Sequence, residues 1–201
     1  MQSSEKQIEH AIKAKPRGTL VFPEDFTDYG SSDAIRKALE RLKNKKLLAR
    51  VAHGIYVRPK QSDLIGSLLP TVEELAEGIA KRDRIRTIPS GAYALNALGL
   101  STQVPMKIVL LTDGSPREIK VGKRTIKFKK TTPKNLLAKG TISRLVIQAL
   151  KEIGNGNVSE QEEAKIIALL KTETPADLKH DIALAPVWIQ KIMKKALHND
   201  K

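Results

Sequence analysis

The sequence contains no cysteine and few aromatic residues. Without cysteine there are no disulfides, no thiolate zinc sites and no cysteine nucleophile, which is typical of a reducing compartment. Aromatic residues make up only 3% of the chain, so aliphatic side chains must fill the core. The first 15 residues lack the apolar segment of a signal peptide, and no apolar run has the length of a membrane span. We therefore expect a cytoplasmic protein with no membrane partner.

Motifs for catalysis and metal binding are also missing. The four histidines are scattered, and no pair has the helical spacing of metal ligands. The sequence has no phosphate-binding loop, dinucleotide fingerprint or nucleophile elbow. Ser90 has no neighbouring base to activate it, so a helix cap is its simplest role. The sequence therefore predicts no enzymatic activity, no metal and no cofactor.

Basic residues are in large excess. The chain carries 36 Lys and Arg against 22 Asp and Glu, a formal net charge of +14. A positive field of this size attracts polyanions, and nucleic acid is the natural partner of that kind. Lysine-rich solvated surfaces also keep proteins dispersed, so the charge by itself leaves both interpretations open.

The stretch from residue 31 to residue 58 predicts a helix followed by a hairpin. Ile35, Ala38, Leu39 and Leu42 recur at helical spacing, so the helix has one apolar face. The apolar positions then alternate, which predicts two strands, near residues 48–51 and 55–57, joined by a tight turn. A helix that runs into a basic hairpin is the second half of a winged helix-turn-helix domain. In that domain the helix enters the major groove of DNA and the hairpin contacts the backbone or the minor groove.

The preceding residues supply the other parts of such a domain. The spacing predicts a helix over 4–15, a short strand at 19–22 and a short helix from Pro23 to Phe26. Residues 1–60 are therefore predicted to form a winged helix-turn-helix DNA-binding domain. Gly66 and Pro70 mark residues 61–70 as a linker.

The rest of the chain predicts two further parts. Residues 71–135 are predicted as a small α+β domain, with a helix over 71–83, a strand at 85–88 and a second helix opening at Pro89 and Ser90. Its three further strands are expected at 106–112, 118–121 and 125–130. Residues 136–201 are predicted as a helical extension with apolar stripes at 142–150, 164–170 and 182–197. The fold class is therefore α+β: an N-terminal winged helix-turn-helix, a small α+β middle domain and a C-terminal helical segment.

Ten residues of the first domain are candidates for DNA contact. Arg36 and Lys37 lie about one turn into the long helix, on its polar face, where they reach base edges or phosphates. Hydroxyls and amides at the helix start suit a phosphate. The candidates are Ser31, Ser32, Asp33, Arg36, Lys37, Arg41, Arg50, His53, Tyr56 and Arg58. The alternative is that Arg36 and Arg41 only form surface ion pairs with Asp33 and Glu40.

A second basic surface is predicted further along the chain. Residues 117–139 contain 9 Lys and Arg and one acidic residue, Glu118. The candidates are Lys120, Lys123, Arg124, Lys127, Lys129 and Lys130. Proteins that bind single strands normally offer several stacking aromatics, whereas Phe128 is the only one in this segment. Direct nucleic-acid contact and a solvated or partner-facing basic edge are therefore both open.

The chain resembles the AbiEi antitoxin family over about residues 4–135. The resemblance to the winged domain of that family rests on Asp25-Phe26, Gly30-Ser31, Leu39 to Leu42, Leu48 to Val51 and Gly54-Ile55-Tyr56. Residues 87–132 are similar to the domain that follows, most recognisably at Ser90-Gly91 and from Asn96 to Leu100.

The resemblance implies a transcriptional repressor that is not an enzyme. Such antitoxins are taken to bind their own promoter through the winged domain and to counter a nucleotidyltransferase-like toxin through the next domain, often without stable toxin contact. The partners implied are duplex operator DNA and a cognate toxin. The family pattern places Ser32, Arg36, Lys37 and Arg41 toward DNA, and Arg50, His53 and Arg58 on the wing. His53 stands where the family often has Arg or an aromatic residue before the Gly.

Two other classes of function remain. The chain is alternatively a protein-interaction module, in which the winged fold is a scaffold and the middle domain binds a toxin or another partner. An enzyme that acts on nucleic acid is the third class, and the empty motif search argues against it. Apolar residues on the last helices leave self-association open as well.

Overall fold

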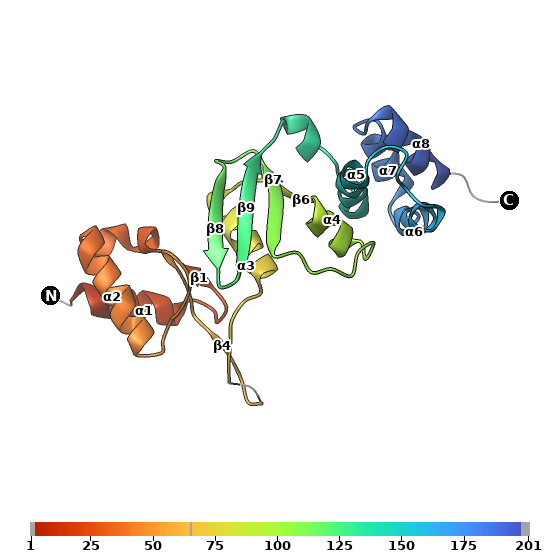
Figure 1. Ribbon diagram of the computed structural model, residues 1–201. Coiled ribbons are helices and arrows are strands. Elements are labelled where there is room, and N and C mark those ends of the chain that lie inside the picture. The colour runs from red at the N-terminus through yellow and green to blue at the C-terminus, as the bar shows by residue number, and fades with distance from the viewer. Residues whose placement is uncertain (1–2, 65, 198–201) are drawn as a thin grey trace. The chain divides into compact units, whose positions relative to one another are not determined.

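The chain folds into two compact units in the computed structural model, which describes residues 3–64 and 66–197. The first unit contains Met1–Arg82 and Ile119–Lys123, and the second contains Asp83–Glu118 and Arg124–Lys201. The predicted α+β class is confirmed, with helices and small sheets along the chain (Figure 1). One limit between the units, after Arg82, falls inside the predicted middle domain. The domain limits given by the sequence stay predictions.

The N-terminal part has the winged helix arrangement that the sequence predicts. Its helices are α1 (Ser4–Ala14), η1 (Pro23–Tyr29, a 3₁₀ helix) and α2 (Ser32–Asn44). Its strands are β1 (Leu20–Val21), β2 (Ala49–Ala52) and β3 (Ile55–Val57), in the antiparallel order β1-β3-β2. Side chains at helical spacing on α1 and α2 form a buried core with Phe26 of η1. The core therefore consists mainly of aliphatic side chains.

Local signals fix the ends of these elements. The hydroxyl of Ser3 accepts the N–H of Lys6, and the hydroxyl of Ser31 accepts the N–H of Ala34 at 3.3 Å, so a serine caps each long helix. Gly54 turns the chain between β2 and β3 with a φ of 68°, a value that side chains other than glycine rarely adopt.

A hairpin that was not predicted from the sequence begins at Lys60 and continues through most of the predicted linker. Strands β4 (Lys60–Ser62) and β5 (Gly66–Leu68) pair antiparallel and form a two-stranded sheet. Nearly all of their residues are exposed, so no alternation of apolar and polar residues marks them in the sequence. Helix α3 (Val72–Asp83) follows, and the capping box predicted at Thr71 and Glu74 is present.

The middle sheet contains β6 (Thr87–Ser90), β7 (Lys107–Thr112), β8 (Arg117–Val121) and β9 (Arg124–Lys130), in the order β6-β7-β9-β8. Strand β7 pairs antiparallel with β6 and parallel with β9. Ile108 and Leu110 are buried, as predicted for a strand of this composition.

The prediction that a helix begins at Pro89 and Ser90 was wrong, because the helix begins later. Both residues belong to β6, and helix α4 spans Ala92–Ala97. Strand β6 lies at the edge of the sheet, where the missing N–H of a proline costs little. Gly91 is the N-cap of α4 and no side chain caps this helix, so Ser90 is not its cap.

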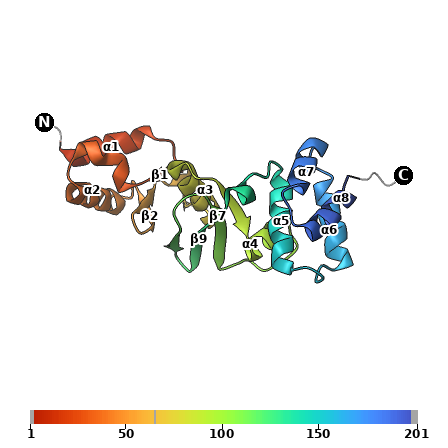
Figure 2. The same cartoon turned by 90° about the horizontal axis from the view of Figure 1, so that it is seen from above.

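The C-terminal segment is helical, as predicted, but its last stripe forms two helices. The helices are α5 (Thr141–Ile153), α6 (Glu160–Leu170), α7 (Pro175–Ile182) and α8 (Val187–Lys195), seen side by side in Figure 2. Pro186 is the N-cap of α8, and its extended ψ of 150° and missing N–H separate this helix from α7. Buried residues of all four helices form one core with α4. Among the described residues, none of these or the other helices has the length and hydropathy of a membrane span.

Two acidic side chains hold the start of α5. Asp181 is fully buried, and its carboxylate accepts the N–H groups of Lys139 at 2.9 Å and Gly140 at 2.8 Å. His180 contributes a ring nitrogen 2.7 Å from the same carboxylate. Glu173 accepts the N–H of Ser143 at 3.2 Å. These carboxylates satisfy N–H groups that a helix start leaves without partners.

We expect Asp181→Asn to lower the free energy of unfolding by about 2–4 kcal/mol, because one buried backbone N–H loses its anionic acceptor. Urea denaturation followed by circular dichroism measures the change. Glu160→Gln is the control, since it removes a carboxylate from an exposed position in the first turn of α6. Equal effects of the two substitutions would contradict a capping role for Asp181.

Candidate nucleic-acid interface

A hollow of about 310 Å³ lies between α2 and the hairpin formed by β2 and β3. It brings together five residues that the sequence selected as candidates for DNA contact. They are Arg36, Lys37, Arg50, His53 and Tyr56. Helix α2 supplies the first two and the hairpin supplies the others, so the long helix and the wing share one surface.

The two basic residues of α2 are exposed and differ in their partners. The Nε of Arg36 donates to the carbonyl of Ser32 at 3.2 Å, and no carboxylate pairs with Arg36 in the described part of the chain. The Nζ of Lys37 lies 2.9 Å from a carboxylate oxygen of Asp33, one helical turn away. The hydrogen bond from Lys37 keeps the pKa of the Asp33 carboxyl below its usual value. Arg36 is therefore the freer cation of this pair.

The wing carries a second cation. The guanidinium of Arg50 donates to Nδ1 of His53 at 3.0 Å, and its Nε donates to the carbonyl of Ala52 at 3.4 Å. An arginine can only donate, so Nδ1 of His53 is the acceptor in this contact. Both side chains are exposed. The wing therefore presents the fixed positive charge of Arg50 beside the ring of His53.

The start of α2 presents hydroxyl and amide groups together with one acidic side chain, Asp33. The hydroxyl of Ser31 caps α2, whereas Ser32 is exposed and only its carbonyl has a partner among the described residues. The positive end of the helix dipole lies here and favours an anion such as a phosphate. Asp33 is equally exposed and acts against an anion, although Lys37 neutralises it.

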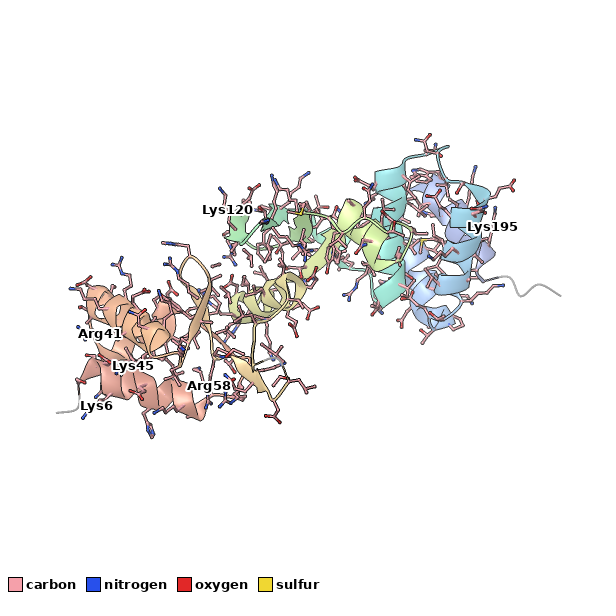
Figure 3. All side chains as sticks on the ribbon, turned by 60° about the horizontal axis from the view of Figure 1, so that its bottom comes forward. Lys6, Arg41, Lys45, Arg58, Lys120 and Lys195 are labelled. Atoms are coloured by element: carbon pink, nitrogen blue, oxygen red, sulfur yellow. The ribbon has the colours of Figure 1, made fainter. Side chains whose placement is uncertain are left out.

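Arg41 faces α1 and is not part of the hollow. Its guanidinium lies 3.0 Å from a carboxylate oxygen of Glu5, and Lys45 contacts the other oxygen at 2.8 Å. Figure 3 shows Arg41, on α2, and Lys45, which follows the end of α2, near α1. Hydrogen bonds from Lys45 and Arg41 keep the pKa of the Glu5 carboxyl below its usual value. Arg41 therefore forms an ion pair, as the alternative interpretation predicted. Its partner is Glu5 of α1 and not a residue of its own helix.

Arg58 and Tyr56 also have structural roles. The guanidinium of Arg58 donates to the carbonyls of Lys13, at 2.8 Å, and Lys15, at the end of α1. These carbonyls have no partner within the helix, so the arginine occupies its negative end. Only 6% of Tyr56 is exposed, and it packs in the core of the winged part at the edge of the hollow. Arg58 does not line the hollow, and its predicted contact with DNA stays a prediction.

The candidates of the second basic surface come from β8, from β9 and from the turn between them. Lys120 lies on β8, Lys123 lies in the turn, and Arg124, Lys127, Lys129 and Lys130 lie on β9. On β9 the strand alternation places Lys127 and Lys129 on one face and Lys130 on the other. Glu118 lies 3.0 Å from both Lys107 and Lys127. Part of this charge is therefore compensated within the chain.

Three residues that line the hollow, Pro23, Glu40 and Gly54, are not among the predicted candidates. Glu40 lies four residues after Arg36 and three after Lys37, so helical spacing alone could have placed it on the same face. Pro23 comes from the start of η1, and only the tertiary structure brings it to this surface. Within residues 3–64 and 66–197, no group of three or more His, Asp or Glu could hold a metal ion.

The fold and this surface define a winged helix-turn-helix protein. A family model matches residues 7–178, and the chain belongs to that family, the family of unknown function DUF6088. No curated protein is significantly similar to the chain.

We expect Arg58→Gln to lower the free energy of unfolding by about 1–2 kcal/mol, because the carbonyls at the end of α1 lose a charged donor. Chemical denaturation measures the change. The matched substitution Arg50→Gln, on the exposed wing, should cost less than about 0.5 kcal/mol. A larger loss for Arg50→Gln than for Arg58→Gln would contradict these assignments.

Proposed function

We propose that the chain is a cytoplasmic DNA-binding transcriptional repressor that acts as an AbiEi-type antitoxin. In this role it represses its own operon by binding duplex operator DNA, and it counters a nucleotidyltransferase-like toxin. The observation that supports DNA binding most directly is the shared hollow of α2 and the wing, where Arg36, Lys37 and Arg50 gather. The antitoxin role is supported by the resemblance of residues 4–135 to the AbiEi family.

The chemistry of the hollow suits duplex DNA. An exposed arginine on a helix that enters the major groove offers the planar donor pair that guanine edges accept. Lys37 and Arg50 offer charges for the flanking phosphates, and the exposed start of α2 offers amide groups. The net charge of +14 adds a long-range attraction that depends on salt.

A protein-interaction module is the second candidate function, and the β4–β5 hairpin favours it. Leu64, between these strands, is 95% exposed, and Leu69 just after β5 is 54% exposed. When such leucines form a contiguous apolar patch, they mark a surface that binds another protein. In this alternative the winged part is a scaffold, and operator DNA is not bound.

We expect the full-length protein to bind the DNA directly upstream of its own gene with an affinity that falls steeply as salt rises. Arg36→Ala should cost about 1–3 kcal/mol of binding free energy on that sequence, because a base contact is lost. Lys37→Ala should weaken binding to all duplexes alike and reduce the salt slope by about 1. Fluorescence anisotropy over a salt series measures both effects.

Lys179→Ala is the matched control for these variants, because this exposed lysine lies on α7 in the second unit. It should retain the affinity and salt slope of the parent protein. Unchanged binding in both the Arg36 and Lys37 variants would exclude the hollow as the DNA contact. An absence of binding to any duplex would favour the interaction module.

The antitoxin role predicts rescue of growth. Co-expression of the chain with the toxic product of the neighbouring gene, both from foreign promoters, should restore growth. The double variant Arg36→Ala, Lys37→Ala should rescue equally well, because neutralisation is assigned to the domain after the winged part. Continued growth arrest with the parent protein would contradict the antitoxin role and leave the DNA-binding proposal intact.

A further inference from the structure

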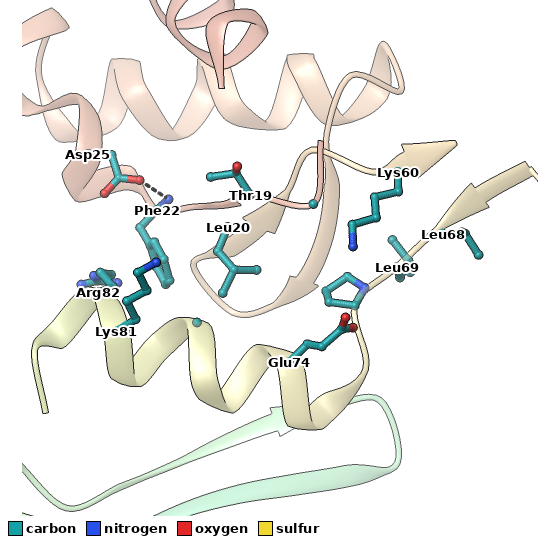
Figure 4. Close-up of a pocket in the computed structure, with 13 residues that line it drawn as sticks. Thr19, Leu20, Phe22, Asp25, Lys60, Leu68, Leu69, Glu74, Lys81 and Arg82 are labelled. Atoms are coloured by element: carbon teal, nitrogen blue, oxygen red, sulfur yellow. Dashed lines mark hydrogen bonds between the residues drawn. The ribbon is translucent and has the colours of Figure 1, made fainter. Parts of the chain in front are cut away.

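A cavity of about 650 Å³ lies within the first unit, between the segment around β1 and helix α3 (Figure 4). It is separate from the hollow assigned to DNA, and the two share no lining residue. Its volume is within the range of sites that bind small organic molecules, about 300–1,000 Å³. The residues that line it come from β1, η1, the β4–β5 hairpin and α3.

The floor of the cavity depends on a close approach of Leu20 to the backbone of α3. A Cβ atom added at Gly78 would lie 2.6 Å from Cδ1 of Leu20, so only glycine allows this approach without movement. Glycine inside a helix costs about 1 kcal/mol relative to alanine. Gly78 therefore lowers the stability of α3 at the position where this helix meets the cavity.

The walls of the cavity are largely apolar. Phe22 is 4% exposed, and the guanidinium of Arg82 lies 3.9 Å from the centre of its ring. Leu68 and Leu69 also line the cavity and are 37% and 54% exposed. These leucines leave apolar surface in contact with water, and a ligand with an apolar body would cover it.

The acidic side chains that line the cavity have hydrogen-bond partners, whereas two of its lysines have none among the described residues. Asp25 accepts the N–H of Phe22 at 3.0 Å, and Glu74 accepts the N–H of Thr71 at 2.7 Å, so both carboxylates already serve helix starts. Lys60, on β4, and Lys81, on α3, reach toward the cavity from different elements (Figure 4). Neither ammonium group has a hydrogen bond or an ion pair within the described parts of the chain. The cavity therefore offers two cations without a carboxylate partner.

We propose that this cavity binds a small amphipathic organic anion. The apolar body of the ligand lies against Leu20, Phe22 and Leu69, and its acidic group lies in the field of Lys60 and Lys81. An organic cation is disfavoured, because both carboxylates are already hydrogen-bonded and the two lysines would repel it. This site does not depend on the proposed DNA contact, because it uses other residues.

Two dyes of matched shape test the proposal with the full-length protein. 1-Anilinonaphthalene-8-sulfonate carries an acidic group, and N-phenyl-1-naphthylamine is the same aromatic body without it. We expect the sulfonate to bind saturably, with one molecule per chain, and more tightly than the neutral dye. Lys60→Gln with Lys81→Gln should weaken the sulfonate about tenfold and change the affinity for the neutral dye less than about twofold. Fluorescence titration measures both affinities.

Three variants locate the site. Leu69→Ser should weaken both dyes, because it removes part of the apolar wall from an exposed and tolerant position. Arg36→Gln with Lys37→Gln should leave both dyes unaffected, and so should Lys179→Gln. Circular dichroism melts show whether each variant is folded, and retained binding of the neutral dye shows that the cavity is intact.

Three results would overturn the proposal. The first is sulfonate binding that is unchanged in the Lys60 and Lys81 double variant. The second is equal loss of both dyes in that variant while it remains folded. The third is loss of the sulfonate in the Arg36 and Lys37 variant, which would place the dye in the hollow of α2. Because DNA binding is tested at Arg36 and Lys37 and the dye site at Lys60 and Lys81, the two proposals can fail separately.

Discussion

The apolar stripe of α2 packs against α1 and η1, and this burial sets the direction of every other side chain on the helix. Leu39 and Leu42 are fully buried, and Ile35 and Ala38 are nearly so. A helix that turns these positions inward must turn Arg36 and Lys37 outward, because they lie roughly 110° and 150° from the centre of this stripe around the helix axis. The candidate interface is thus a consequence of core packing. The wing then closes one side of the exposed face.

Some cations of the winged part are bound within the fold, whereas others have no carboxylate partner among the described residues. Arg41 and Lys45 pair with Glu5, and Arg58 binds carbonyls at the end of α1. These contacts join α1 to α2 and to the sheet, so the positive charges of these three residues are partly compensated within the fold. Arg36 and Arg50 have no carboxylate partner among the residues the structure describes, and they remain available to an external anion.

The elements with a strong local pattern could be predicted from the sequence, whereas several others could not. The two long helices of the winged part follow from apolar periodicity, and the buried strand β7 follows from a nearly continuous apolar run. Both signals depend only on neighbours in the chain. The β4–β5 hairpin has no such period because its residues are exposed. Pro89 was misplaced because a proline suits the start of a helix and an edge strand equally well. Its position at the edge depends on the whole sheet.

The sequence by itself determined the α+β class, the winged arrangement and the excess of positive charge, because composition and local periodicity are properties of the chain alone. Only the tertiary structure decided which of the predicted cations are bound within the fold. Arg36 and Arg58 were both candidates for DNA contact, but α1 ends beside Arg58 and not beside Arg36. The cavity near α3 also appears only in three dimensions, since Leu20 and Gly78 meet across 58 positions of the chain.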